Sequence, residues 1–208
     1  MNSFILFCMV SSVCIKICLA DFDNLQDVCP AESTSQQTIF INGLPCKNPA
    51  TITPSDFKSS KLSRRGNTEN FCSSSTTIIT AFDFAGLNTL GLSIARTDLD
   101  VDGVVPPQTH PRATEIFFVG AGVVIIGFVD TQTQFFQKIL KEGEVFVVPK
   151  GMLHFCANAG NEDATVYSVF NSQNPGLVSI AGAMFDPDPE MIKKLVRKIN
   201  SLPGTEME

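Results

Sequence analysis

The sequence predicts an all-β domain, a barrel or sandwich built from many short strands. Between residues 76 and 181, short segments rich in β-branched and aromatic residues follow one another, separated by Gly, Asn, Asp or Pro. Strands of this length and spacing are typical of antiparallel sandwiches and barrels. Hydrophobic residues make up 44% and charged residues 17% of the 208 residues, which suits one globular domain with terminal extensions.

The expected strands cover residues 76–84, 89–98, 115–119, 122–129, 134–140, 144–148, 154–157, 164–170 and 178–181. The chain shows no internal repeat and no low-complexity tract. Its net charge is −6, and no basic cluster interrupts this acidic balance. We therefore expect no nucleic-acid partner.

The N-terminal segment, residues 1–20, is predicted to be a secretory signal peptide cleaved after Ala20. An apolar run from residue 4 to residue 20 ends in one small residue, Ala20, where a cleavage site is expected. A membrane anchor is the rival interpretation, but the run is short and Lys16 interrupts it. No later segment is long and apolar enough to span a bilayer, so we expect a secreted protein without a membrane partner after cleavage.

The regions that flank the strands have their own patterns. Residues 21–60 contain repeated prolines and predict an irregular arm, with a short strand near residues 38–41 and a helical turn near residues 53–57. Residues 63–75 are polar and predict a mobile loop. Residues 188–200 switch to helical period, and Asp188 can cap this helix. Its apolar stripe consists of Met191, Ile192, Leu195, Val196 and Ile199.

Cysteine usage agrees with secretion. Seven cysteines occur, and the four outside the signal segment are Cys29, Cys46, Cys72 and Cys156. An even number in a secreted protein suggests disulfides, whose pairing the count leaves open. Cys72 and Cys156 could pair with each other or stay free. Cys156 shares strand parity with His154, so it could also face the barrel interior, as a metal ligand or, as we favour, as a small buried hydrophobe.

Two segments carry the residues with metal-binding chemistry. The only 2 histidines of the chain, His110 and His154, lie in them together with Glu115. Two neutral imidazoles and a carboxylate are a typical ligand set for a divalent first-row metal. Side chains alternate along a strand, so Glu115 would face away from His110 unless the chain bends, and Pro111 favours a bend there.

These segments resemble the paired boxes of the cupin superfamily, and closely those of the germins and germin-like proteins of plants. The matching words include Pro106-Pro107, His110-Pro-Arg-Ala-Thr-Glu115-Ile, Gly143, Pro149, Gly151, His154-Phe155 and Asn158. Further words match outside the boxes, among them Leu25-Gln-Asp-Val-Cys29, Asn42-Gly-Leu-Pro-Cys46, Asn88-Thr-Leu-Gly-Leu-Ser and Phe170-Asn-Ser-Gln-Asn-Pro-Gly176. The resemblance covers essentially the whole chain.

The resemblance implies a cupin jelly-roll β-barrel over residues 61–187, preceded by an irregular N-terminal arm and followed by a short helical region and tail, 188–208. It also implies a disulfide between Cys29 and Cys46 and a location in the apoplast or cell wall. Germins assemble as hexamers built from dimers, so we expect a homo-oligomer, with the C-terminal helix clasping a neighbouring subunit. The alternative is that this helix packs on its own barrel.

The resemblance further implies a manganese site. Germins bind manganese through three His and one Glu, and these roles pass to His110, Glu115 and His154. The remaining ligand position is Gln108, whose amide oxygen is a weaker ligand for Mn(II) or a hydrogen-bond partner for a metal-bound water. The alternative is a site without metal, in which these polar side chains hydrogen-bond to one another.

Two activities belong to the germins, oxalate oxidase and superoxide dismutase. Oxalate oxidation in germins also uses two asparagines, whose positions hold Ala95 and Val105 here. We therefore expect no oxalate oxidase activity, while superoxide dismutation requires only an accessible redox metal. The competing hypothesis is a non-enzymatic protein of the cell wall, structural or involved in defence, or a binder of a small apolar ligand. Such a pocket would be lined by Val105, Phe117, Val147 and Leu153.

Overall fold

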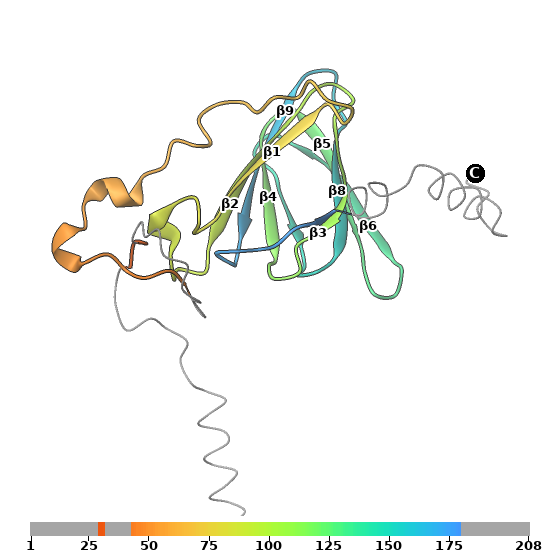
Figure 1. Ribbon diagram of the computed structural model, residues 1–208. Helices are drawn as coiled ribbons and strands as arrows, with labels where there is room; N and C mark the ends of the chain where they lie inside the picture. Colours follow the sequence, from red (N-terminus) through yellow and green to blue (C-terminus); the bar gives the residue numbers. More distant parts are fainter. Residues whose placement is uncertain (1–28, 32–42, 180–208) are drawn as a thin grey trace, which may run out of the picture.

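Two antiparallel five-stranded sheets face each other as the walls of one barrel (Figure 1). The structure is a computed structural model that describes residues 29–31 and 43–179. One sheet has the order β1 (Ser74–Ile79), β2 (Ser93–Leu99), β9 (Ala164–Phe170), β4 (Glu115–Ala121) and β7 (Val145–Val148). The other has the order β10 (Val178–Ser179), β3 (Val104–Thr109), β8 (Leu153–Asn158), β5 (Val123–Val129) and β6 (Phe135–Lys141). The predicted all-β fold is confirmed.

Each expected strand corresponds to an observed one, with two systematic differences. The first two expected strands extend too far toward each other, because residues 80–84 and 89–92 form turns and loop on either side of a short 3₁₀ helix, Ala85–Leu87. Strand β3 was not among the expected strands. Its two adjacent prolines, Pro106 and Pro107, lack the backbone donors that a strand normally uses. They lower the strand propensity of the segment, so the sequence pattern did not predict this strand.

The core lies between the two sheets, where alternate side chains point inward. Strand β4 shows the pattern clearly, since Glu115, Phe117 and Val119 are buried while Ile116 and Phe118 are exposed. The main apolar cluster consists of Leu99, Val105, Phe117, Val119, Val124, Ile126, Leu140, Val148, Cys156, Ala164 and Val166. This period-2 burial is what the sequence pattern predicts for strands with one face in a core.

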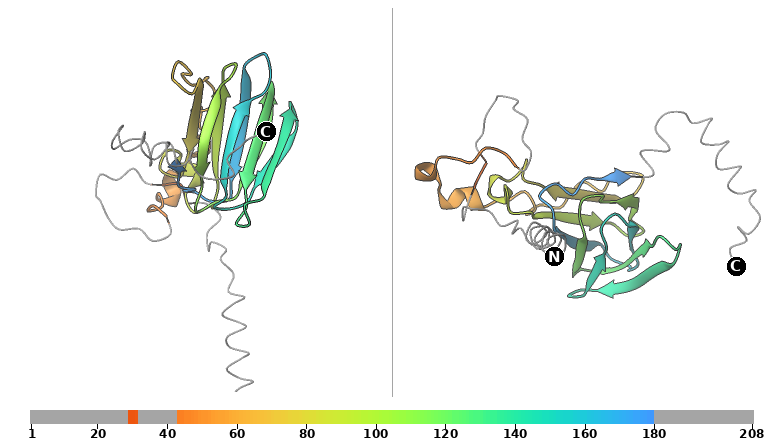
Figure 2. Two further views of the ribbon diagram at one scale, coloured as in Figure 1. Left: turned by 90° about the vertical axis from the view of Figure 1, so that its right-hand side faces the viewer. Right: turned by 90° about the horizontal axis from the view of Figure 1, so that it is seen from below.

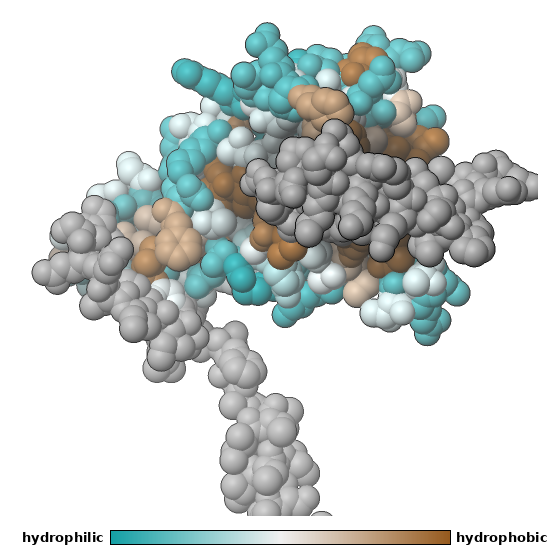
Figure 3. Space-filling view, turned by 45° about the vertical axis from the view of Figure 1, so that its right-hand side comes forward, coloured by the Kyte–Doolittle hydropathy of each residue, from teal (hydrophilic) through white to brown (hydrophobic). Residues whose placement is uncertain are grey.

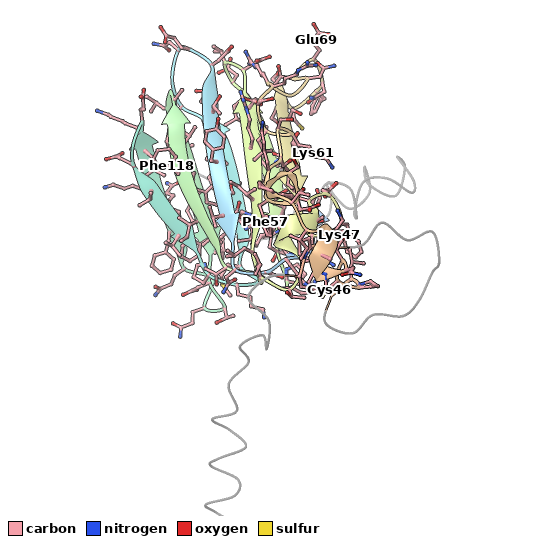
Figure 4. The ribbon with its side chains drawn as sticks, turned by 90° about the vertical axis from the view of Figure 1, so that its left-hand side faces the viewer. Cys46, Lys47, Phe57, Lys61, Glu69 and Phe118 are labelled. Carbon is pink, nitrogen blue, oxygen red and sulfur yellow. A yellow bond between two sulfur atoms is a disulfide. The ribbon has the colours of Figure 1, made fainter. Side chains whose placement is uncertain are left out.

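The described part of the N-terminal arm is held by covalent and polar contacts. Cys29 and Cys46 form a disulfide. The buried side chain of Asn88 donates hydrogen bonds to the carbonyl oxygens of Cys29 and Leu44 and accepts one from the Leu44 amide. The expected helical turn is present as a 3₁₀ helix, Pro54–Phe57, which Thr53 and Asp56 cap reciprocally. Figure 4 shows this arm beside β1, with Cys46 and Phe57 labelled.

The loop before β1 is irregular, as predicted, but it is anchored rather than loose. Asp98, buried on the outer face of β2, accepts a hydrogen bond from the Gly66 amide. The Arg65 guanidinium pairs with Asp100 and Asp163, and the Arg96 guanidinium donates to the Leu62 carbonyl. These bonds tie the loop to the sheet and argue against the mobility that its polar composition predicts.

Several expectations lie outside the described residues. They are the signal segment 1–20, the short strand near residues 38–41 and the helix at 188–200. Within residues 29–31 and 43–179, no helix has the length and hydropathy needed to cross a membrane.

Candidate metal centre

A β-bulge in β3 turns the first metal-binding segment, which contains Gln108 and His110, toward the barrel interior. Val105 pairs with Cys156, and Gln108 pairs with His154, so three steps along β3 match two steps along β8. The extra residue lies at Pro106-Pro107, where the missing amide donors leave the ladder free to bulge. Because cross-strand partners project to the same face, both Val105 and Gln108 point inward with their β8 partners. His110, two residues after Gln108, is also buried.

A tight turn then brings Glu115 to the same interior. The Ala113 amide donates to the His110 carbonyl, closing the turn that begins at Pro111, and β4 starts directly afterwards at Glu115. The bend predicted between His110 and Glu115 is therefore present. It changes the facing, so that the carboxylate of Glu115 lies inside the barrel although an odd number of residues separates it from His110.

The second box enters through a turn that ends at Gly151. Gly151 has a φ of +76°, a left-handed conformation that favours glycine. Its amide donates to the His110 carbonyl at 3.1 Å, which joins the two boxes directly. Two residues later β8 begins, and His154 takes an inward position opposite Gln108 and Phe128.

The three predicted ligands meet at one point. His110, Glu115 and His154 are all buried, and one potential ligand atom of each lies within 4.8 Å of the others. The Glu115 Oε2 atom is 3.2 Å from His154 Nε2 and 3.6 Å from His110 Nε2. The two imidazole rings lie 5.4 Å apart between centroids, and Phe170 and Phe117 pack edge-on against them.

The hydrogen bonds of the other ring nitrogens fix which imidazole nitrogens can bind a metal. His110 Nδ1 lies 2.5 Å from the Gly176 carbonyl oxygen, and His154 Nδ1 lies 2.9 Å from the Met152 carbonyl oxygen. A carbonyl oxygen can only accept, so both Nδ1 atoms carry the proton. In the neutral rings both Nε2 atoms are therefore lone-pair acceptors, which is the form that ligates a metal.

This arrangement places three acceptors against one another without a donor. Among the described residues, Glu115 Oε2 and His154 Nε2 are buried atoms that have no hydrogen-bond partner. Their 3.2 Å separation is an ion pair only if the imidazole is protonated. Protonation of the other ring is disfavoured, because burial lowers the pKa of His110 and outweighs the raising effects of Glu115 and the Gly176 carbonyl. A cation between the three atoms would satisfy them, so the residues fit a divalent metal.

Gln108 and Cys156 flank this centre on the same inner wall. Gln108 is half-buried and lies opposite His154, a position from which its amide oxygen could serve as a fourth ligand. Cys156 lies one inward position beyond His154 and belongs to the apolar cluster. Burial raises the pKa of its thiol to about 12, and the Glu115 charge acts in the same direction. The thiol is therefore protonated near neutral pH and packs as a small hydrophobe.

The wall around the site is apolar where germins that oxidise oxalate carry amides. Ala95 and Val105 are both buried and inward-facing. Of the residues proposed to line an apolar ligand pocket, Val105 and Phe117 are inside the barrel, but Val147 is 50% exposed on its outer surface. Leu153 also alternates outward, because His154 and Cys156 face inward. Including Val147 and Leu153 in an interior pocket was therefore wrong.

Comparison with known proteins agrees with the fold and the site. Residues 60–207 match the Cupin family. The chain is 55% identical over 177 residues to germin-like protein subfamily 3 member 4 of Arabidopsis thaliana, covering 85% of this chain and 84% of that protein. It is 50% identical over 183 residues to germin-like protein 11-1 of Oryza sativa subsp. japonica, covering 88% and 82%.

Solved structures of similar proteins share the fold of this chain. An oxalate oxidase in complex with the substrate analogue glycolate superposes with a TM-score of 0.76 at 35% identity, covering 84% of this chain and 90% of that one. Peruvianin-I, described as a cysteine peptidase from Thevetia peruviana latex, superposes with a TM-score of 0.70 at 38% identity, covering 76% and 96%. With the fold, the two boxes and these relatives in agreement, the chain belongs to the germin-like proteins of the cupin superfamily.

Proposed function

We propose that this protein is a secreted germin-like protein of the plant apoplast or cell wall that holds a manganese ion on His110, Glu115 and His154. The observation that carries this proposal is the convergence of three acceptor atoms from buried side chains, two of which, Glu115 Oε2 and His154 Nε2, have no hydrogen-bond partner among the described residues. The Cys29–Cys46 disulfide supports an oxidising compartment. The oxygen ligands of Glu115 and Gln108 favour manganese over softer metals.

Superoxide dismutation is the reaction that the site supports best. When bound, manganese supplies a centre that cycles between two oxidation states. Two superoxide anions and two protons give dioxygen and hydrogen peroxide, so no other oxidant or reductant is needed. The chain contributes a rigid set of ligands and an apolar wall that limits water.

Oxalate oxidation is not proposed, although an oxalate oxidase is among the similar structures. A dicarboxylate bound near His110 would face Ala95 and Val105, whose side chains offer no hydrogen-bond donor. Cysteine peptidase activity, named for Peruvianin-I, is not supported by Cys156 either. Its buried thiol has a pKa of about 12, far above what a thiolate nucleophile requires.

The first experiment is to measure manganese content and the manganese EPR spectrum of the secreted protein beside a Gln108→His variant. Near-stoichiometric manganese in the native protein, removed by chelators together with superoxide dismutase activity, would support the proposal. A native protein that binds no manganese, beside a variant that does, would instead support a non-enzymatic structural or ligand-binding role in which the metal site has decayed.

We also propose that the protein self-associates, as a hexamer, through apolar outer surfaces. On the sheet that contains β4, Val169, Ile116 and Val147 lie side by side across three strands, and Phe118 and Val145 continue the patch. Each of these side chains is 42–59% exposed. Figure 4 shows this face with Phe118 labelled, and Figure 3 shows further apolar patches on the side of the barrel that lies to the right in Figure 1. Apolar patches of this kind mark protein interfaces.

Light scattering of purified protein tests the assembly. Phe118→Glu should shift the native oligomer toward smaller species, because it places a charge within the patch. Phe82→Glu changes an equally bulky and 73% exposed residue elsewhere and serves as the matched control. A Phe118→Glu protein with unchanged mass would contradict the use of this face.

A further inference from the structure

The loop after β9 couples the surface of the protein to the buried imidazole of His110. The Gly176 carbonyl accepts the Nδ1 proton of His110, so the position of this one carbonyl determines the direction of the ring. Gly176 has a φ of +69°, and a Cβ atom there would lie 2.9 Å from the Arg112 guanidinium. The loop at Gly176 therefore lies directly against the Arg112 side chain.

Arg112 holds this loop from two directions. Its Nε and Nη2 atoms donate to the backbone carbonyl and the side-chain oxygen of Asn174, at 2.7 and 2.9 Å. Its backbone amide donates to the Pro175 carbonyl at 3.1 Å. The planar guanidinium can make both side-chain bonds at once, which a lysine ammonium on a flexible stem cannot reproduce.

A second pair of hydrogen bonds connects the same two segments next to Arg112. The Thr114 amide donates to the Asn171 side chain at 2.8 Å, and the Asn171 amide donates to the Thr114 carbonyl. The turn between His110 and Glu115 is thus bound at both ends to the loop that contains Gly176. Strand β9, which precedes this loop, pairs with β4, which begins at Glu115. Figure 2 shows the barrel from two further directions.

We propose that Arg112 is a positioning residue for the metal centre. It holds Asn174 and Pro175 so that the Gly176 carbonyl keeps the His110 proton on Nδ1 and Nε2 toward Glu115 and His154. The inference rests on the proposed metal-binding function for its consequence, but the orientation and tautomer of His110 are properties of the metal-free protein. Arg112 itself is exposed and touches none of the three ligand atoms.

The direction of the change in metal affinity distinguishes a positioning role of Arg112 from an effect of its positive charge alone. Arg112 is a cation, so removing its charge alone would raise the affinity for a divalent metal. Loss of positioning lowers that affinity instead. Direct hydrogen-bond partners of ligating histidines contribute about 10–100-fold to metal affinity. Arg112 contacts the loop and not the His110 ring itself. We therefore expect Arg112→Ala to weaken Mn(II) binding by a few-fold to about tenfold.

The test uses the full secreted chain and two readouts. The first is Mn(II) affinity by chelator competition for Arg112→Ala, Arg112→Lys and Arg64→Ala. Arg64 is exposed and has no hydrogen bond or ion pair with the described residues, so Arg64→Ala is the matched charge control. We expect weaker binding for both Arg112 variants, with no rescue by lysine, and unchanged or slightly tighter binding for Arg64→Ala.

The second readout is solid-state NMR of metal-free protein labelled with ¹⁵N only at histidine, which gives a simple spectrum because the chain has 2 His. In Arg112→Ala, the His110 signals should show both tautomers, while the His154 signals stay unchanged because Met152 holds that ring. An unchanged His110 tautomer together with unchanged or tighter manganese binding would overturn the proposal. If the alanine variant does not fold, Arg112→Lys, which keeps charge and length, decides by the same criteria.

If native protein binds no manganese, the proposed function fails, whereas the NMR result still confirms or refutes the positioning role.

Discussion

The two ends of the barrel interior are built from the same strands but follow opposite physical rules. At one end, where β2 and β4 finish and β9 begins, Leu99, Val119 and Val166 are fully buried in the large apolar cluster. At the other end, Glu115 and the two histidines are buried beside a small cluster of Ala95, Ala113 and Phe170. The first end is filled by close-packed apolar side chains. The second has buried acceptor atoms that find no donor within the described part of the chain and that a bound cation would satisfy.

The comparison teaches that burial alone does not distinguish a core from a site. His154 and Cys156 are two residues apart on one face of β8, and both are almost inaccessible to solvent. One has a ring nitrogen aimed at a carboxylate, while the other has a thiol that packs against aliphatic side chains. Stability should therefore depend mainly on the apolar end, and metal affinity mainly on the polar end.

The largest expected effect is a loss of stability at the apolar end. Leu99→Ala removes a fully buried side chain and should lower the free energy of unfolding by about 2–5 kcal/mol. Chemical denaturation of the metal-free protein measures this change, with Leu90→Ala, at a 45% exposed position, as the control. Manganese affinity of the folded variant should stay within about twofold of native, because the sites are distant. A large loss of affinity would show that the two ends are coupled.

The next effect is a loss of metal affinity at the polar end. Glu115→Gln replaces an ionised ligand by a neutral amide, and should weaken manganese binding more than about a hundredfold, beyond what outer partners contribute. The same change should raise the stability of the metal-free protein by about 1 kcal/mol, because it removes a buried carboxylate and its amide can donate to His154. Chelator competition and chemical denaturation measure the two quantities.

The exposed Glu162→Gln provides the matched control for that substitution. It should leave both manganese affinity and stability unchanged. Unaltered manganese binding by Glu115→Gln would remove Glu115 from the ligand set, and a loss of stability without metal would contradict the unfavourable burial of its carboxylate.

The smallest expected effect is a change in the pH dependence of stability, caused by Cys156 at the boundary between the two ends. The pKa of Cys156 is raised from 9.0 to about 12 in the folded protein, so the neutral thiol stabilises the fold fully below pH 9. As pH rises above 9 the unfolded chain ionises first, and stability should fall by about 1.4 kcal/mol per pH unit from this group. Denaturation at pH 8, 9 and 10 should show a shallower loss for Cys156→Ala than for native protein.

Cys72→Ala is the control for the pH experiment, because Cys72 is a half-buried thiol outside the barrel interior. It should keep the native pH dependence. Identical pH dependence in native and Cys156→Ala proteins would show that the Cys156 thiol is reached by water.

How much of this could be read from the chain alone differs between elements. The strand pattern predicted the sheets, except β3, because Pro106 and Pro107 reduce its strand character while the bulge that they create keeps it paired. The ligand set was predictable because only 2 His occur and both lie in recognisable boxes. The outward direction of Val147 and Leu153 was not predictable in this way. A residue that is close in sequence to a ligand can lie on either face of its strand.

By itself, the sequence determined the all-β fold, the germin-like family and the chemical types at the site, because these follow from residue identity and spacing. Only the tertiary structure decided how those side chains face one another. The bulge in β3 and the turn before Glu115 each change strand parity. The Gly176 carbonyl, 66 residues from His110 in the chain, fixes the proton of that ring, whereas the neighbouring Met152 carbonyl fixes the proton of His154. The facing of the ligands and the tautomer of His110 depend on contacts between segments distant in the chain, which no local pattern encodes.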